Sequence, residues 1–293
     1  MNKKIMAIGA HADDVELHFG GTLFKYMDRG YEIVYVMSTN NMSGSKRVLQ
    51  PDGSHVKSDV FYVAETMAYR KQEAADAARL FNTTPIHLDH PQRHCHVRDG
   101  RGGLRQMELR YGCELPEVVP GNVPSILTAF EDQASIDSLA GLILKHDPEV
   151  IFTHGLAEVN PEHHCTFLLV KNAYWKAEKQ GYRGSLLMGV RGFAELGKFA
   201  GCWETWVDVT GFFDRRMAAV NKHVSQYPPE FKRGITHWRE IYSKRGKICG
   251  VEAAEAFNFV NTPKAGQASG ELTGELMRNR AEKSPWGPVE TPE

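Results

Sequence analysis

One stretch near the N-terminus constrains the fold more than any other part of the chain. The apolar run Ile5–Ile8 ends in Gly9 and is followed at once by His11 and by the adjacent pair Asp13 and Asp14. A short, partly β-branched run bounded by glycine is typical of a buried strand, and the sequence that follows is typical of a helix. Ligands of open α/β sheets bind beyond the carboxyl ends of the strands. The order of strand, polar residues and helix therefore predicts an α/β fold with its chemistry at this point.

The histidine and the two aspartates carry side chains of the kind that bind zinc. A catalytic zinc takes three protein ligands, commonly imidazole nitrogens and carboxylate oxygens, and keeps one open position. Because adjacent residues after a strand point in different directions, one aspartate can bind the metal while the other stays free as a base. The alternative is that His11 and the aspartates only cap the following helix. The stretch supplies two ligands, so a third has to come from elsewhere in the chain.

A second segment with the same order lies near the middle of the chain. Residues 149–154 are typical of a strand, and Pro161 preceded by Asn160 as a cap predicts the start of a helix. His163 falls in the first turn of that helix, which is where the aspartate pair lies relative to its own strand. We therefore predict His163 as the third ligand. The neighbouring His164 is the alternative, and whichever of the two is not a ligand caps or solvates the helix start.

Composition limits the class of protein. The chain has 293 residues and a formal net charge of -1 at pH 7, so no overall field attracts nucleic acid or an anionic membrane. No apolar run is long enough to span a bilayer, and five scattered cysteines without a CxxC pair are typical of reduced thiols in a cytoplasmic protein. We expect residues 1–260 to form a single domain, with about 93–124 as a lid-like insertion that lacks periodicity. Residues 261–293 are expected to be a polar, loosely ordered tail.

These segments resemble the LmbE-like zinc deacetylases, the family that includes the eukaryotic PIG-L de-N-acetylase. The first motif of that family has His-Pro/Ala-Asp-Asp, an acidic residue and Gly-Gly after a strand, and it corresponds to residues 10–21. The helical Arg-x-x-Glu element corresponds to residues 70–73, and the second motif, His-Pro-Asp-His, to residues 160–163. Further matches lie at 147–154, 207–210, 222–226 and 253–257, so the resemblance covers most of residues 4–257.

The resemblance implies a fold and a set of roles. The fold would be a Rossmann-like three-layer sandwich with a mostly parallel sheet. His11, Asp14 and His163 would bind Zn²⁺, or another divalent metal. Asp13 would be the general base that takes a proton from the metal-bound water, which is the nucleophile. Asn160 stands where the family has the first histidine of its second motif, and an amide can polarise a developing oxyanion but cannot give up a proton.

Three further residues are expected to bind the substrate. Arg70 and Asp89 would grip sugar hydroxyls or a phosphate, and the alternative is an ordinary place on a helix surface and at a strand end. His154 would also face the substrate. One possibility is that Asn160 only polarises the developing oxyanion and does not replace the family histidine in proton transfer. The other is that His154, His164 or a histidine of the insertion supplies the missing part of that role.

The predicted function is a zinc-dependent hydrolase that removes an N-acyl group, expected to be acetyl, from an amino sugar or its conjugate. Its partner would be this small-molecule sugar, with neither nucleic acid nor membrane as a partner, and a homo-oligomer is left open. The alternative is a catalytically impaired protein that binds metal and sugar on the same fold, because Asn160 replaces a histidine. A nucleotide-binding Rossmann protein is disfavoured, because the segment after the first strand lacks GxGxxG and carries acidic groups where phosphate would lie.

Overall fold

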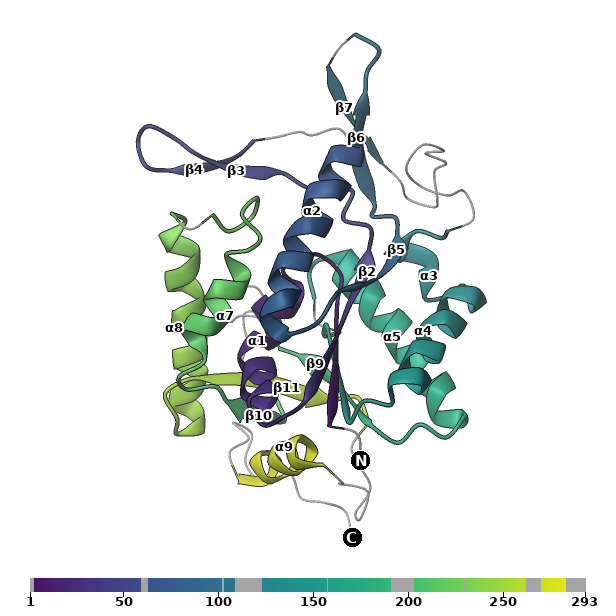
Figure 1. Cartoon of the computed structure of the whole chain (residues 1–293), viewed down its shortest axis with the longest axis vertical. Helices are drawn as coiled ribbons and strands as arrows, with labels where there is room; N and C mark the ends of the chain where they lie inside the picture. The colour runs from purple at the N-terminus through teal and green to yellow at the C-terminus, as the bar shows by residue number, and fades with distance from the viewer. Residues whose placement is uncertain are drawn as a thin grey trace.

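A seven-stranded sheet forms the centre of the molecule (Figure 1), with the strand order β10-β11-β9-β8-β1-β2-β5. The computed structural model describes residues 3–58, 63–101, 103–108, 123–156, 158–190, 203–228, 230–261 and 270–282. The strands of the sheet are β1 (Lys4–Gly9), β2 (Glu32–Thr39), β5 (Ile86–His90), β8 (Val150–Thr153), β9 (Ser185–Gly189), β10 (Thr205–Asp208) and β11 (Ala254–Phe259). The first five pair in parallel, whereas β11 pairs antiparallel with β9 and with β10. The expected mostly parallel sheet is confirmed.

Helices cover both faces of this sheet (Figure 1). They are α1 (Asp14–Met27), α2 (Val63–Ala78) with the 3₁₀ turn η1 (Arg79–Phe81), α3 (Ile126–Ala129), α4 (Gln133–His146), α5 (Pro161–Lys179), α7 (Phe213–Val220), α8 (Lys232–Cys249) and α9 (Glu271–Glu282). The helices α3, α4 and α5 pack on one face, and α1, α2, α7, α8 and α9 pack on the other. The expected three-layer α/β sandwich is therefore confirmed.

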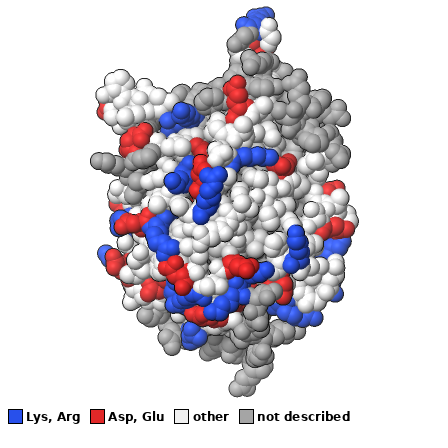
Figure 2. Space-filling view, viewed as in Figure 1, with Lys and Arg blue, Asp and Glu red and all other residues white. Residues whose placement is uncertain are grey.

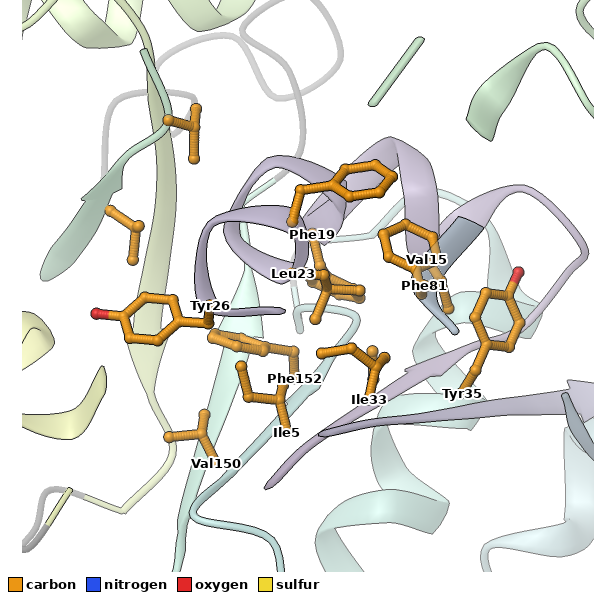
Figure 3. Close-up of a cluster of buried hydrophobic side chains, with 14 of the residues drawn as sticks. Ile5, Val15, Phe19, Leu23, Tyr26, Ile33, Tyr35, Phe81, Val150 and Phe152 are labelled. Atoms are coloured by element: carbon orange, nitrogen blue, oxygen red, sulfur yellow. The ribbon is translucent and has the colours of Figure 1, made fainter. Parts of the chain in front are cut away.

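The side chains of β1 alternate between two apolar cores. Ile5 packs with Phe19 of α1 on one face of the sheet (Figure 3), and Met6 and Ile8 pack against the helices of the other face. All of them are fully buried. A strand covered on both faces needs apolar residues throughout, which is why β1 reads as an unbroken apolar run in the sequence.

Two hairpins lie outside the central sheet (Figure 1). Strands β3 (Lys46–Leu49) and β4 (His55–Ser58) form one, and β6 (His94–Arg98) and β7 (Leu104–Glu108) form the other. The sequence predicted an irregular lid-like insertion over 93–124, so its first part is more regular than expected. Two-stranded hairpins have no fully buried face, and their pattern is therefore a weak signal. Residues 109–122 of the insertion lie outside the described residues.

The expectation of a loosely ordered tail is wrong for the residues of α9. Leu272 and Leu276 are fully buried in the core beside β10. The carboxylate of Glu149 accepts hydrogen bonds from the hydroxyl of Tyr31, at 2.6 Å, and from the backbone amide of Thr273, at 2.7 Å. Composition did not predict this helix, because two apolar anchors in a polar stretch are enough to dock it. Residues 262–269 and 283–293 of the tail lie outside the described residues.

The surface carries both signs of charge. Acidic and basic side chains are interspersed over the face in Figure 2, in keeping with the net charge of -1. Among the described residues, no helix has the length and apolar character that a bilayer crossing requires.

Leu276→Ala is expected to lower the free energy of unfolding by about 2–5 kcal/mol, because it leaves a cavity under α9. Leu49→Ala is the matched control, since Leu49 is 50% exposed on the β3–β4 hairpin, and we expect it to change stability by less than about 0.5 kcal/mol. Urea unfolding of the full chain measures both values. Equal effects of the two substitutions would show that α9 is not part of the folded core.

Candidate metal centre

Parallel pairing of β1 with β8 brings two distant loops to one edge of the sheet. Ile5 lies opposite Val150 in this pairing, and Ala7 lies opposite Phe152. The polar residues after β1 and the first turn of α5 after β8 therefore meet beyond the carboxyl ends of the two strands, as the sequence predicted. Gly9 is needed at the end of β1, because a Cβ there would come within 2.9 Å of Cβ of Asp14.

Three predicted ligands converge at this edge. Nδ1 of His11 lies 3.0 Å from Nε2 of His163 and 3.3 Å from Oδ2 of Asp14. Nε2 of His163 lies 3.4 Å from Oδ1 of Asp14. The side chains of Asp14 and His163 are about 95% buried, and that of His11 is 15% exposed.

The three donors fit a divalent metal such as zinc. Tetrahedral zinc with ligands at about 2.0–2.1 Å places neighbouring ligand atoms about 3.3–3.4 Å apart. The contacts among His11, Asp14 and His163 span 3.0–3.4 Å. Two imidazoles and one carboxylate also leave a fourth position open, as catalytic sites require.

The protonation of these groups follows from their contacts. Burial lowers the pKa of His163 to about 4, although the charge of Asp14 opposes this. Burial also acts on Asp14, but the rings of His163 and His154 outweigh it and hold the pKa of Asp14 well below its ordinary value. Burial alone would lower the pKa of His11, but hydrogen bonds to Asp14 and Glu162 raise it to about 10. A metal therefore competes with a proton for His11.

Glu162 supports His11 from the side away from the other two ligands. Oε2 of Glu162 lies 2.6 Å from Nε2 of His11 and 3.1 Å from the amide nitrogen of Gln92, and Oε1 accepts a 2.9 Å hydrogen bond from the backbone of Arg93. Burial would raise the pKa of Glu162, but its contacts with His11, Arg93 and Gln92 together outweigh burial and lower the pKa to about 2. Glu162 occupies the acidic position of the second motif, but this position alone did not predict a role for it.

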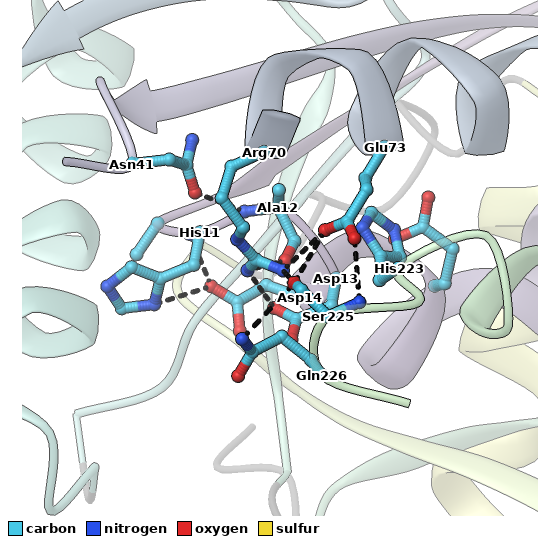
Figure 4. A network of polar contacts seen from close by, with 12 residues as sticks. His11, Ala12, Asp13, Asp14, Asn41, Arg70, Glu73, His223, Ser225 and Gln226 are labelled. Carbon is cyan, nitrogen blue, oxygen red and sulfur yellow. Dashed lines mark hydrogen bonds and ion pairs between the residues drawn. The ribbon is translucent and has the colours of Figure 1, made fainter. Parts of the chain in front are cut away.

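Asp13 lies beside the three ligands in a strained backbone conformation, with φ of 120° and ψ of -24°. Such angles cost of order 1–3 kcal/mol in a residue other than glycine and persist only where neighbours enforce them. The preceding residue, Ala12, is held at both ends (Figure 4): its amide donates to Oδ1 of Asn41 at 2.7 Å, and its carbonyl accepts from Arg70. The turn therefore directs Asp14 toward the other ligands and leaves Asp13 apart.

Arg70 joins Asp13 to a second buried carboxylate. Its guanidinium lies 3.6 Å from Oδ1 of Asp13 and 3.1 Å from Oε2 of Glu73. Glu73 in turn accepts hydrogen bonds from the backbone amide and the hydroxyl of Ser225, at 2.7 and 2.8 Å. Arg70 and Glu73 are both buried. The alternative that they lie on a solvated helix face is therefore wrong.

The pKa of Asp13 is suited to proton transfer. Burial raises it to about 6, and the positive charge of Arg70 opposes that rise. A carboxyl group with a pKa near neutrality can accept a proton and return it.

The other predicted residues occupy different places. The side chain of Asn160 caps α5, where its oxygen accepts a 3.0 Å hydrogen bond from the amide of Glu162. Nδ1 of His164 lies 3.1 Å from the carbonyl oxygen of Leu156, and His164 is not part of the donor group formed by His11, Asp14 and His163. The donor group of the site therefore contains His163 and not His164.

His154 and Asp89 lie away from the expected substrate position. His154 is buried behind the ligands, where Nε2 is 2.9 Å from the amide nitrogen of Ala10 and its ring stacks on that of His163 at 4.0 Å. The carboxylate of Asp89 forms a 2.7 Å ion pair with Lys71. Neither His154 nor Asp89 is among the described residues that line the cleft.

A cleft of about 380 Å³ opens over the ligands. Its described walls include the three ligands, Asp13 and Asn160, and they continue onto both hairpins and α8. Arg93, His94 and His96 of the cleft wall belong to the predicted lid-like insertion, whereas Arg47, Tyr227 and Trp238 are among the lining residues that the sequence did not single out. No local pattern marks these last three residues, because they come from three separate segments.

The fold and the site define an α/β protein with a candidate metal centre at the carboxyl ends of adjacent parallel strands. Residues 6–174 match the sequence model of the PIG-L family, described as GlcNAc-PI de-N-acetylase. This chain belongs to the PIG-L family of N-deacetylases, as its motifs predicted.

Relatives extend the match beyond that segment. The diacetylchitobiose deacetylase of Thermococcus kodakarensis is 24% identical over 267 residues, which cover 88% of this chain and 83% of that protein. The structure of N,N'-diacetylchitobiose deacetylase from Pyrococcus horikoshii superposes with a TM-score of 0.60 at 20% identity, over 88% of this chain and 84% of that one. GalB, the 4-carboxy-2-hydroxymuconate hydratase of Pseudomonas putida, superposes with a TM-score of 0.61 at 17% identity, over 89% and 97%. The two solved structures share the fold alone, so the reaction has to be argued from the site.

Arg70→Met is expected to lower the free energy of unfolding by about 3–5 kcal/mol, because it leaves the buried carboxylates of Asp13 and Glu73 without their cation. Arg79→Met is the control: Arg79 pairs with Asp76 at the surface, and an exposed pair contributes about 0–1 kcal/mol. Chemical denaturation of the two variants tests this, and equal losses would contradict the role given to Arg70.

Proposed function

We propose that this chain is a zinc-dependent hydrolase that removes an N-acyl group, acetyl in the first instance, from an amino sugar or its conjugate. The observation that carries the proposal is the convergence of His11, Asp14 and His163 with Asp13 left apart beside them. The deacetylase activity in the names of the family and of the Thermococcus kodakarensis relative supports the choice of reaction and of acyl group.

Each residue then has one task. When bound, zinc supplies Lewis acidity and lowers the pKa of a water molecule to about 7. His11, Asp14 and His163 hold the ion. Asp13 accepts the proton of the attacking water and returns it to the departing amine, for which a pKa of about 6 is suitable.

Asn160 is the donor for the developing oxyanion. Its side-chain oxygen is used by the cap of α5, which orients the amide group at the wall of the cleft and leaves the NH₂ group to donate. Such a fixed donor stabilises negative charge on an acyl oxygen. Because an amide donates a hydrogen bond without giving up its proton, proton delivery falls to Asp13.

The cleft walls favour a sugar. Trp238 and Tyr227 offer aromatic surface for the apolar face of a ring, and Arg47 and Arg93 offer hydrogen-bond donors for hydroxyl or acidic substituents. The backbone amide of Arg47 donates to the carbonyl of Ser225 at 2.8 Å, and its Nε donates to the carbonyl of Gln226 at 2.6 Å. The guanidinium of Arg47 lies 4.2 Å from the centre of the Phe231 ring. These contacts fix Arg47 at the wall before a substrate arrives.

Asp13→Asn is expected to reduce amine release from N-acetylglucosamine and diacetylchitobiose by about 10²–10⁴-fold, because it removes the general base. Asp214→Asn, at a side chain that is 90% exposed on α7, should keep the wild-type rate. Both are measured with zinc added. A zinc-loaded wild type that binds these sugars but releases no amine would instead support the catalytically impaired alternative.

His163→Ala and His164→Ala form a matched pair for metal content. We expect wild type and His164→Ala to retain about one zinc per chain after dialysis, and His163→Ala to lose it, because two ligands hold zinc poorly. Elemental analysis of the purified full chain reads this out. Loss of zinc from His164→Ala alone would reverse the assignment, and a wild type that takes up no divalent metal would end the proposal.

A further inference from the structure

Glu158, in the loop between β8 and α5, lies behind the candidate centre and has no role in the function proposed above. Its side chain is 2% exposed, and Oε2 lies 3.3 Å from Nδ1 of His163. The other ring nitrogen of His163, Nε2, faces His11 and Asp14. One ring nitrogen of His163 thus faces the candidate metal position, and the other faces the buried carboxylate of Glu158.

We propose that Glu158 is a positioning residue that holds His163 in the orientation required for metal binding. This inference rests on the metal binding of the proposed function. When Nε2 of a histidine binds a metal, Nδ1 carries the proton and needs an acceptor. A carboxylate at that nitrogen fixes the tautomer and the rotation of the ring, and it increases the basicity of the ligating nitrogen.

His154 completes the support. Its ring stacks on that of His163, with the centroids 4.0 Å apart and the planes 19° apart, and its Nδ1 lies 3.8 Å from Oε1 of Glu158. Stacking fixes the plane of the His163 ring, and the carboxylate fixes its rotation within that plane. His154 thereby acquires a place in the site different from the substrate contact that the sequence predicted.

A second metal is the competing explanation for these residues. Donor atoms of His18, His154, Glu158 and His163 lie within 4.8 Å of one another. A second ion held by all four would need the nitrogen of His163 that faces Glu158, while the first ion takes the opposite one. One imidazole would then have to lose its last ring proton and bridge two cations, so the hydrogen-bonded arrangement is favoured.

Zinc affinity of the full chain tests the proposal by competition with a chromophoric chelator. Glu158→Ala is expected to weaken zinc binding by about 10–100-fold. Glu158→Gln keeps an oxygen acceptor and should recover part of that loss. Glu131→Gln, at an exposed glutamate of the α3–α4 turn, is the control and should bind zinc as wild type does. Cobalt-loaded Glu158→Ala should also show a shifted visible spectrum, because the ligand ring is no longer held in one orientation.

The outcomes separate this inference from the proposed function. If wild type binds no divalent metal, the proposed function fails. If wild type binds zinc and His163→Ala does not, but Glu158→Ala keeps wild-type affinity and cobalt spectrum, only the role of Glu158 is refuted. Two zinc ions per wild-type chain and one in Glu158→Ala would show that Glu158 is a ligand, which also overturns the proposal. Should Glu158→Ala not fold, an unchanged affinity in Glu158→Gln together with an unchanged cobalt spectrum decides against it.

Discussion

The parallel pairing of β1 with β8 is the contact on which the whole site depends. His11 and His163 are 152 residues apart in the chain, yet their ring nitrogens lie 3.0 Å apart. Closing so long a loop for a few polar contacts would be unfavourable. The apolar core on both faces of β1 stabilises that closure instead. The site is therefore positioned by buried apolar surface and not by its own hydrogen bonds.

The turn after β1 places Asp13 and Asp14 in different surroundings, Asp14 beside His11 and His163, and Asp13 beside Arg70. Three contacts restrain the turn. Asn41, which follows β2, and Arg70, which lies on α2, form hydrogen bonds to the backbone of Ala12. Within the turn itself, the amide of His11 donates to Asp14 at 2.6 Å. Together they enforce the positive φ of Asp13. Without this strain the two carboxylates would not be held in different positions, as the proposed division between metal binding and proton transfer requires. The strained backbone at Asp13 thus gives two adjacent aspartates different surroundings.

The convergence of His11, Asp14 and His163 could be predicted from the sequence, because each residue is tied to a strand end by the local order of residues. His11, Asp14 and His163 needed only the rule that parallel strands present their carboxyl ends together. The burial of Arg70 could not be predicted in this way, because its partner Glu73 is completed by Ser225, which is 152 residues further along. The same holds for α9 and for both hairpins: their places are set by tertiary contacts that leave no periodic signal. Local rules predicted which side chains meet at this edge of the sheet, whereas the groups packed around them became apparent only from the fold.

The charges around the centre favour the binding of a cation there. Besides Asp14, which is one of the three donors, the carboxylates of Asp13, Glu158 and Glu162 lie close to the centre. Arg70 is shared with Glu73, so it offsets only part of this negative charge. Buried carboxylates need nearby positive charge or a hydrogen-bond donor. Without a metal, a proton on His11 would supply one such charge, in keeping with the pKa of about 10 of this side chain. A divalent ion at the same position supplies two charges and displaces that proton, so the carboxylates that raise the pKa of His11 also favour the metal that replaces its proton.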